Sequence, residues 1–388
     1  MRIAYVYDSA YPFTKGGGER RIYEVAKRLS QRGHEVSILS MKCWEGPSLL
    51  RENGLRYRAI SPRFNSYHRS GRRSISQALG FGASAWRLLA HDRYDVLDCG
   101  QWPYFHFFPV KAYSVLRHTP FIITWYEVWK DHWLEYLGKP GVIGMMVERA
   151  FSRLPDKIVA ISEKTESELR SLGVRQARMT MIPNGVDYHR IQSLSPGRTK
   201  THLAYCGRLK NHKNVHLLIE AVAILKRSNP SISAVIIGDG PESVALRDLA
   251  ARLGVIGNIT FTGPIDDFDE VIGWLKASKI FITPSTKEGG GSLTLFEANA
   301  CGLPVIAVHS KNGIDPCLIE SGSNGYFANP DAEEIARMAQ ELLDSPERLQ
   351  SNAMASRDFA ARYDWAAVSD QYERLYMSLL FPNGRKHS

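Results

Sequence analysis

The sequence predicts an α/β protein built from two Rossmann-like domains with parallel sheets. Short apolar runs alternate with amphipathic segments along most of the 388 residues, and this alternation is typical of parallel sheets covered by helices on both faces. A turn-rich stretch from Pro183 to Gly197 interrupts the rhythm near the middle of the chain. We therefore predict an N-terminal domain at 1–190, a C-terminal domain at 191–362 and a final helical segment, 363–388, packed at the domain junction.

The first domain opens with a buried strand at residues 2–8. Ile22, Val25, Ala26 and Leu29 then recur at helical spacing, and Gly33 ends this helix. The same alternation predicts a strand at 35–40, a helix at 75–90, a strand at 96–98, a helix at 104–116, and strands at 121–124 and 157–161.

The second domain repeats this rhythm from residue 203 onward. Its apolar runs are short enough for buried strands, and most are followed by a segment with helical periodicity. We expect strands at 203–206, 233–237, 259–261, 280–283 and 305–308, and helices at 215–227, 243–253, 268–277, around Glu297, at 332–343 and at 365–380.

Composition excludes several classes of protein. The chain is 44% hydrophobic and 23% charged, as in ordinary globular domains, and its apolar runs are far shorter than the roughly 18–20 residues that span a bilayer. The start of the sequence enters a strand without the features of a signal peptide, which predicts a cytoplasmic protein. Five scattered cysteines form neither a metal-binding spacing nor a disulfide framework, so we expect reduced thiols.

Positive charge is concentrated in the first half of the chain. Residues 1–190 carry 29 Lys and Arg against 18 Asp and Glu, whereas the remainder has a net charge of −2. Between 51 and 73 only Glu52 opposes a set of arginines, namely Arg51, Arg56, Arg58, Arg63, Arg69, Arg72 and Arg73. Such a basic surface attracts anionic lipid headgroups, an acidic acceptor or nucleic acid. The alternative is a solvated loop.

Three glycines follow the first strand, in the order Lys15-Gly16-Gly17-Gly18-Glu19. Glycines at a helix start permit close backbone approach, and the free amides there favour a phosphate. The spacing does not match the G-x-G-x-x-G fingerprint, which disfavours a nicotinamide enzyme. A flexible turn is the structural alternative.

A basic loop, Cys206 to Asn214, lies between a strand and a helix of the second domain. Arg208 and Lys213 are suited to neutralise a diphosphate, because arginine can bind two oxygens and lysine supplies a compact charge. An exposed loop without a ligand would have the same composition.

The segment from Glu288 to Pro304 combines glycines with a short helix. Ser292 is expected at the N-cap, while Gly302 and Pro304 mark the helix end, so the glycines lie at the amide-bearing end, where a phosphate can bind. Glu297 is placed to accept hydrogen bonds from two ribose hydroxyls, since a buried glutamate without partners is costly.

An acidic pair, Asp267-Phe268-Asp269, is a candidate metal site. A D-x-D pair can hold a divalent ion and a sugar diphosphate. Because this pair stands at an expected helix start, helix capping is favoured over metal binding. We therefore expect no metal and no cofactor.

Taken in order, these motifs resemble the retaining GT-B enzymes of glycosyltransferase family 4, also called glycosyl transferases group 1. The similarity runs nearly end to end, through 16–19, 161–163, 182–187, Gly207-Arg208 with Lys213, 238–242, 261–263 and 288–297. The resemblance implies two Rossmann-like domains whose sheets face an interdomain cleft.

The resemblance also implies roles for individual residues. Arg208 and Lys213 would bind the donor diphosphate, Glu297 the ribose and Glu288 the transferred sugar. Gly263 and Pro264 would lie beside the base. The remaining donor contacts would come from Gly289, Gly290, Gly291, Ser292 and Leu293, and from Gly16, Gly17 and Gly18 of the other domain.

Two positions depart from the family pattern. The family usually has seven residues between its two glutamates, whereas eight separate Glu288 from Glu297. Tyr126, followed by Glu127, stands where the family often has a histidine followed by an acidic residue. Tyr126 and Glu127 are therefore expected on the acceptor side, without a role that depends on histidine.

The predicted activity is transfer of a hexose, of glucose or mannose type, from a nucleoside diphosphate sugar to an acceptor hydroxyl with retained configuration. We expect a glycan or lipid-linked acceptor, a role in cell-surface glycan or glycolipid synthesis, and peripheral attachment to the anionic inner face of the membrane. No nucleic-acid partner is expected, because no recognition motif accompanies the basic charge.

The alternatives to this activity are a noncatalytic nucleotide-sugar-binding homologue and a sugar-nucleotide epimerase. Uracil, guanine and adenine all remain open as the donor base.

Overall fold

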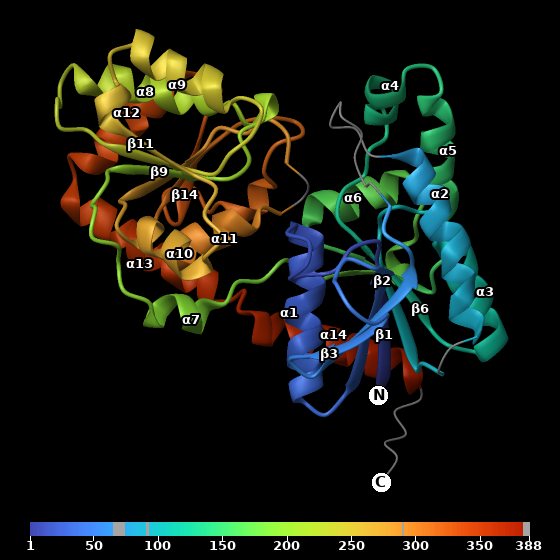
Figure 1. Cartoon of the computed structure of the whole chain (residues 1–388). Helices are drawn as coiled ribbons and strands as arrows, with labels where there is room; N and C mark the ends of the chain where they lie inside the picture. The colour runs from blue at the N-terminus through green and yellow to red at the C-terminus, as the bar shows by residue number, and fades with distance from the viewer. Residues whose placement is uncertain (65–73, 91–92, 289–290, 383–388) are drawn as a thin grey trace. The chain divides into compact units, whose positions relative to one another are not determined.

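The structure is a computed structural model that describes residues 1–64, 74–90, 93–288 and 291–382 (Figure 1). The chain folds into two compact units. The first contains Met1–Pro183 and the chain from Trp365 onward, and the second is Asn184–Asp364. The first unit thus ends at Pro183 rather than at residue 190, and the segment that follows Asp364 returns to it.

The first unit contains an eight-stranded sheet among its described residues, in the order β3-β4-β2-β1-β5-β6-β7-β8. Neighbouring strands are parallel except for β3 and β4. The strands are β1 Arg2–Val6, β2 Glu35–Met41, β3 Leu49–Glu52, β4 Leu55–Ser61, β5 Val96–Gly100, β6 Phe121–Trp125, β7 Lys157–Ala160 and β8 Met179–Met181.

The β3–β4 pair is a hairpin that the sequence analysis did not predict. Asn53 and Gly54 connect the strands and have φ angles of 51° and 78°, and an Asn-Gly pair at positive φ is typical of a two-residue type I′ turn. The first part of the basic stretch is therefore not a loop. Arg51 and Arg56 lie opposite each other on the hairpin, and Arg56 forms a 3.1 Å ion pair with a β2 residue, Glu35. Arg69, Arg72 and Arg73 lie outside the described residues.

Helices cover both faces of this sheet. Figure 1 shows α1 (Gly17–Gln31) and α14 (Trp365–Leu380) on one side and α2 (Ile75–Ser84) and α3 (Phe107–Arg117) on the other. The 3-10 helix η1 (Ala85–Ala90) continues α2, and the unit also contains α4 His132–Leu137, α5 Gly141–Phe151 and α6 Glu163–Ser171.

The buried guanidinium of Arg21 explains why the chain returns to this unit after residue 364. Arg21 donates hydrogen bonds to Ile182 O and Pro183 O, both 2.6 Å, and to the Tyr372 hydroxyl of α14, 3.0 Å. A buried charge needs such partners. One side chain of α1 thus holds both the end of the first segment and the returning helix.

The second unit has an all-parallel six-stranded sheet among its described residues, in the order β11-β10-β9-β12-β13-β14. Successive strand residues alternate between two cores, since side chains along a strand point to opposite faces: Leu203 and Ile282 belong to one, Ala204 and Phe281 to the other. The strands are β9 Leu203–Cys206, β10 Ala234–Ile237, β11 Ile259–Gly263, β12 Ile280–Thr283, β13 Val305–Val308 and β14 Gly325–Ala328.

Two groups of helices complete these cores (Figure 1). One face carries α8 Val215–Lys226, α9 Ser243–Arg252 and α12 Ala332–Leu343. The other carries α7 Tyr188–Ser193, α10 Phe268–Lys276, α11 Leu293–Ala300 and α13 Pro346–Ala361. Each unit is therefore a sheet between two helical layers, and both sheets are parallel except for the edge strand β3 of the first unit, which confirms the predicted fold class.

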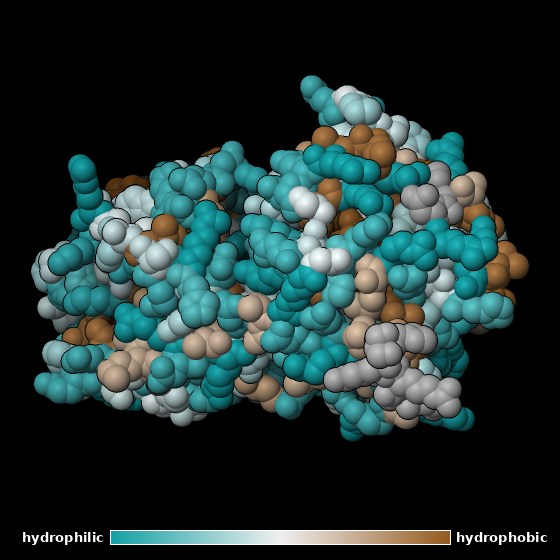
Figure 2. Space-filling model, turned by 90° about the horizontal axis from the view of Figure 1, so that it is seen from below, coloured by the Kyte–Doolittle hydropathy of each residue, from teal (hydrophilic) through white to brown (hydrophobic). Residues whose placement is uncertain are grey.

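The face drawn in Figure 2 is mostly hydrophilic, with hydrophobic residues gathered in separate patches. Among the described helices, none combines the length and the apolar character that a membrane span requires.

Candidate active site

The candidate donor site lies where the strand order of the second unit reverses. Between β9 and β12 the sheet extends in opposite directions, and the loops after two such strands leave a crevice at their carboxyl ends. Two hydrogen bonds join the loops: Thr286 N donates to His212 O at 3.1 Å, and the side-chain amide Asn214 Nδ2 donates to Pro284 O at 3.2 Å. The topology thus brings the basic loop and the glycine-rich segment together.

Lys213 and Glu288 meet at this edge of the sheet. Lys213 Nζ donates a 2.5 Å hydrogen bond to Glu288 Oε1, and the side chains are only 20% and 12% exposed. The spacing between Glu288 and Glu297 is one residue longer than in the family pattern. Even so, Glu288 lies beside Lys213, which is predicted to bind the diphosphate. Arg208 lies on the same loop with an exposed side chain, and its carbonyl accepts a 3.2 Å hydrogen bond from the Tyr205 hydroxyl.

Burial and the cations of the basic loop lower the pKa of two further side chains, Lys210 and His212. Burial, followed by the nearby Arg208 and Lys213, lowers the pKa of Lys210. Burial, followed by Lys213 and Lys210, likewise lowers the pKa of His212. Each of these cations disfavours protonation of its neighbours. A bound anion would relieve this repulsion, so the loop is electrostatically suited to a diphosphate.

Helix α11 begins at the same edge of the sheet. Ser292 occupies the N-cap as predicted, but its hydroxyl bonds the Thr294 hydroxyl at 2.8 Å and does not cap a backbone amide. The amides of the first turn, from Leu293 onward, are therefore not satisfied by this serine. Gly291 is fixed by Asn184, whose Nδ2 donates to Gly291 O at 3.0 Å. Gly289 and Gly290 lie outside the described residues.

The far end of α11 agrees with the prediction. The helix ends at Ala300, and Gly302 adopts a φ of 82° while Leu303 N donates to Ala298 O at 2.9 Å, as expected of a glycine-terminated helix. Glu297 lies inside α11 and is 6% exposed. Burial is the main cause that raises the pKa of Cys301, and the nearby Glu297 carboxylate raises it further.

Gly263 reaches this edge through a chain of close backbone contacts. Gly238 N donates to Gly263 O at 3.0 Å, and Gly207 N donates to Ile237 O at 2.9 Å, so the loops after β11, β10 and β9 lie side by side. Gly263 has a φ of 73°, which favours glycine, and exposed Pro264 follows it. The predicted base-side pair therefore lies on the same rim as Arg208.

Asp267 caps helix α10, as the capping interpretation predicted. Its carboxylate accepts a 3.1 Å hydrogen bond from Asp269 N. Asp269 forms a 2.7 Å ion pair with Arg190. Both carboxylates therefore have structural partners.

The glycine turn of the first unit lies against Tyr126. Gly16 occupies the N-cap of α1 and Gly17 is its first residue. A methyl group on Gly18 would approach the Tyr7 hydroxyl to 3.1 Å and the Tyr126 ring to 3.3 Å. The Tyr126 hydroxyl is buried without a hydrogen-bond partner among the described residues, and burial raises its pKa. An unpaired buried hydroxyl is costly unless a ligand satisfies it.

Gln101, which the sequence analysis did not single out, positions both acceptor-side residues. Its Oε1 accepts hydrogen bonds from Tyr126 N and Glu127 N at 3.0 and 3.1 Å, and its Nε2 donates to Glu127 O at 2.6 Å. Its position directly after β5 could have predicted this role, because β5 and β6 are parallel neighbours and the loops that follow them lie at the same edge of the sheet.

Comparisons with known families agree with this geometry. Residues 15–190 match the family model described as Glycosyltransferase Family 4, and residues 190–358 match that described as Glycosyl transferases group 1. Together these matches span most of the chain. The chain therefore belongs to the family 4, or group 1, glycosyltransferases and is an enzyme of the transferase class.

Individual relatives extend along nearly the full length. The glycogen synthase of Mycobacterium tuberculosis is 26% identical, over 97% of this chain and 95% of that protein. The phosphatidyl-myo-inositol mannosyltransferase of Propionibacterium freudenreichii is 25% identical, over 97% and 94%. Anabaena HepE in complex with UDP-glucose superposes with a TM-score of 0.73 at 19% identity, covering 97% of this chain and all of that one. This last likeness confirms the GT-B fold.

Proposed function

We propose that the enzyme transfers a hexose, of glucose or mannose type, from a nucleoside diphosphate sugar to the hydroxyl of a glycan or lipid-linked acceptor, with retained configuration. The observation that carries the proposal is the grouping of Arg208, Lys213 and Glu288 beside the start of α11. The names of the relatives support this, since they include a glycogen synthase, a lipid mannosyltransferase and a UDP-glucose complex.

The chemistry follows from charge that develops on the leaving group. As the bond between sugar and diphosphate breaks, Arg208, Lys213 and the first-turn amides of α11 stabilise the leaving diphosphate. Glu288 orients Lys213 through their ion pair, and its second oxygen is suited to accept a sugar hydroxyl. Glu297 binds the ribose. The leaving phosphate takes the acceptor proton on the same face, so configuration is retained without a protein nucleophile.

Ligand-induced stabilisation tests the donor site directly. Selective binding of a nucleoside diphosphate or its sugar to the folded chain raises Tm, and this shift is expected to persist in EDTA and to be lost in Arg208→Ala. Arg252→Ala, an exposed arginine at the end of α9, is the matched control and is expected to keep the shift. No shift with any nucleotide at millimolar concentration would contradict the proposal.

Product analysis tests the reaction itself. With the donor identified, transfer to a panel of acceptors is followed by determining the anomeric configuration of the product by NMR. Retention supports the proposed chemistry and inversion contradicts it. Conversion of the donor sugar in the absence of any acceptor would favour an epimerase.

We further propose peripheral attachment to an anionic inner membrane surface. The net charge of +11 on residues 1–190 supports it, because basic segments gain free energy at anionic headgroups. The protein is expected to sediment with phosphatidylserine-containing vesicles at low salt and to be released as salt screens the charges. Recovery of all the protein in the supernatant at low salt would contradict attachment.

A further inference from the structure

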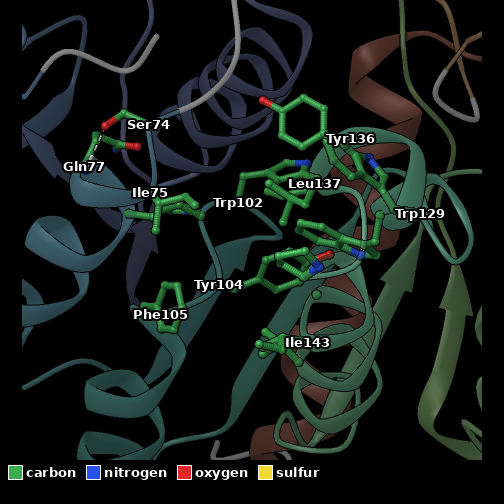
Figure 3. Close-up of a pocket in the computed structure, with 16 residues that line it drawn as sticks. Ser74, Ile75, Gln77, Trp102, Tyr104, Phe105, Trp129, Tyr136, Leu137 and Ile143 are labelled. Atoms are coloured by element: carbon green, nitrogen blue, oxygen red, sulfur yellow. Dashed lines mark hydrogen bonds between the residues drawn. The ribbon is translucent and has the colours of Figure 1, made fainter. Parts of the chain in front are cut away.

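The first unit contains an apolar cavity of about 260 Å³ that has no part in the donor site. It is larger than the cavity of about 150 Å³ that accommodates a benzene ring. Figure 3 shows Trp102, Tyr104 and Trp129 gathered on one side, with Ile75 and Phe105 on the other. The walls come from α2, α4 and α5 and from the loops after β5 and β6.

A buried carboxylate holds the aromatic wall in place. Glu148 of α5, which is fully buried, accepts hydrogen bonds from Trp129 N at 2.9 Å, Lys130 N at 3.0 Å and the Tyr104 hydroxyl at 3.1 Å. Gly144, one turn earlier, leaves room for the Trp133 ring, because a Cβ at this position would overlap that ring. The cavity is therefore built by fixed contacts and is preformed.

The lining favours a hydrocarbon over a sugar. Among the described residues, three buried polar atoms of the wall, Gln77 Oε1, Trp129 Nε1 and Trp133 Nε1, have no hydrogen-bond partner. Three such atoms cannot replace the water around the several hydroxyls of a sugar ring, and burying unpaired hydroxyls is costly. A hydrocarbon chain loses no hydrogen bonds there and gains free energy from burial.

Exposed apolar side chains continue outward from the cavity. Ile75 and Ile143 line it and are also 57% and 65% exposed. Leu79 on α2, and Val142 and Met146 on α5, are exposed in the adjoining helical turns, where residues three or four apart share a face. A soluble aromatic ligand would require only the cavity. Exposed apolar side chains beside the cavity suit a chain that enters from a lipid surface.

The cavity also lies close to the candidate acceptor side. Trp129 follows Tyr126 by three residues, and three residues span at most about 10 Å of backbone. The wall formed by Trp129 is therefore within about this backbone distance of Tyr126, whose hydroxyl lacks a partner among the described residues. Building on the proposed transferase function, we propose that this cavity binds the hydrocarbon chain of a lipid-linked acceptor.

Two variants test the proposal in the full-length protein. Ala78→Phe fills the cavity from α2, and Ile143→Asn makes its exposed rim polar with little effect on folding, because Ile143 packs against little else. Val115→Asn, at an exposed position of α3 outside the cavity, is the matched control. Donor-induced Tm shifts establish that each variant is folded.

Binding is measured first, without catalysis, through the tryptophans of the cavity wall. Farnesyl phosphate represents an isoprenoid chain and decyl phosphate an unbranched one, with inorganic phosphate as the control. We expect both lipids, or one of them, to change the emission, and affinity to fall about tenfold in both cavity variants, which corresponds to two buried methylene groups. Equal affinity in wild type and variants, or no response to either lipid, overturns the proposal.

Transfer then separates this proposal from the proposed function. Acceptors with the same sugar and either a long or a methyl aglycone are compared. We expect the cavity variants to raise KM about tenfold for the long acceptor alone. Equal KM for both acceptors in wild type overturns the cavity assignment and leaves the transferase function intact. Lipid binding without transfer to any acceptor counts against the proposed function and supports the cavity as a binding site.

Discussion

Lys213 Nζ lies 2.5 Å from Glu288 Oε1, although 75 positions separate the two residues in the sequence. The pair joins the loop after β9 to the loop after β12, and little of either side chain is exposed. An arrangement of this kind keeps a cation in place before the diphosphate arrives. It also links the residue expected to bind the leaving group with the residue expected to bind the transferred sugar.

Glu288→Gln should separate donor binding from transfer. The amide keeps the shape but removes the charge that competes with the diphosphate for Lys213, so affinity for the nucleoside diphosphate should stay the same or increase. Loss of an oriented charge should lower kcat about 100-fold or more. Calorimetric Kd values and steady-state kcat for wild type, Glu288→Gln and Lys213→Ala check this. A parallel loss of nucleotide affinity in Glu288→Gln would contradict the assignment.

Nucleotide binding should be accompanied by proton uptake at His212. Burial and the neighbouring Lys213 and Lys210 lower its pKa in the free protein, and a bound diphosphate should raise that pKa by cancelling the positive field. A group whose pKa rises on binding takes up protons, so affinity should increase as pH falls through the window below His212's ordinary pKa of 6.5. Calorimetry in buffers of different ionisation enthalpy measures the uptake, and His212→Gln should reduce it. Identical uptake in that variant would exclude His212 as the group responsible.

Asp98 should make the first unit less stable as pH rises. Burial raises its pKa from 3.8 to about 6, against the opposing effect of hydrogen bonds from Tyr376 and Thr124. Because the folded state binds this proton more tightly than the unfolded state, the stabilising contribution is full below pH 3.8 and is lost as pH rises through about 6. Asp98→Asn removes this dependence.

Relative to wild type, Asp98→Asn should therefore gain about 2 kcal/mol in free energy of unfolding between pH 4.5 and pH 7. Urea unfolding followed by tryptophan emission is a suitable measurement, since seven of the eight tryptophans lie in the first unit. A constant difference between the two proteins across this range would refute the prediction.

Arg21→Ala should destabilise the first unit strongly. It leaves Ile182 O, Pro183 O and the Tyr372 hydroxyl without their buried donor, and disrupting a buried charged network typically costs about 3–5 kcal/mol. Arg32→Ala provides the contrast, because Arg32 also links the end of α1 to α14 but through partly exposed ion pairs with Asp370 and Glu373. Such pairs contribute about 1 kcal/mol or less. Urea unfolding measures the free energy of unfolding of both variants. An equal decrease in the two would show that the buried hydrogen bonds of Arg21 stabilise the unit no more than the exposed ion pairs of Arg32.

Much of the second unit could be predicted from the sequence because most of its strands are buried on both faces. β9, β10, β12 and β13 are largely apolar along their whole length, and β9, β12 and β13 have the predicted bounds. Helix α13 was missed for the opposite reason. It buries the polar residues Asn352 and Ser356, and Asn352 accepts a 2.9 Å hydrogen bond from the Tyr326 hydroxyl. Side chains that are buried through hydrogen bonds leave no apolar period to detect.

The sequence predicted the separate motifs of the candidate site but not the contacts between them. Glycines and cations at strand ends identified the loops, since ligands bind at that edge of a parallel sheet. The Lys213–Glu288 pair and the hydrogen bonds of Gln101 depend on contacts between loops that follow different strands, 75 and 25 positions apart in the sequence. The aromatic cavity required five separate segments to converge. The Asn53-Gly54 turn could have been predicted from its Asn-Gly pair alone, but this stretch was interpreted through the charge of its arginines.

The return of α14 to the first unit sets an order for folding during synthesis. The second unit begins and ends at one place, where Val186 N donates to Tyr363 O at 2.9 Å, so all of its strands and helices leave the ribosome before α14 does. The first unit must wait for Tyr372 and Tyr376, the partners of Arg21 and Asp98, which are translated after the whole second unit. The unit whose strands are synthesised before those of the other therefore completes its own core only after the other unit has been synthesised.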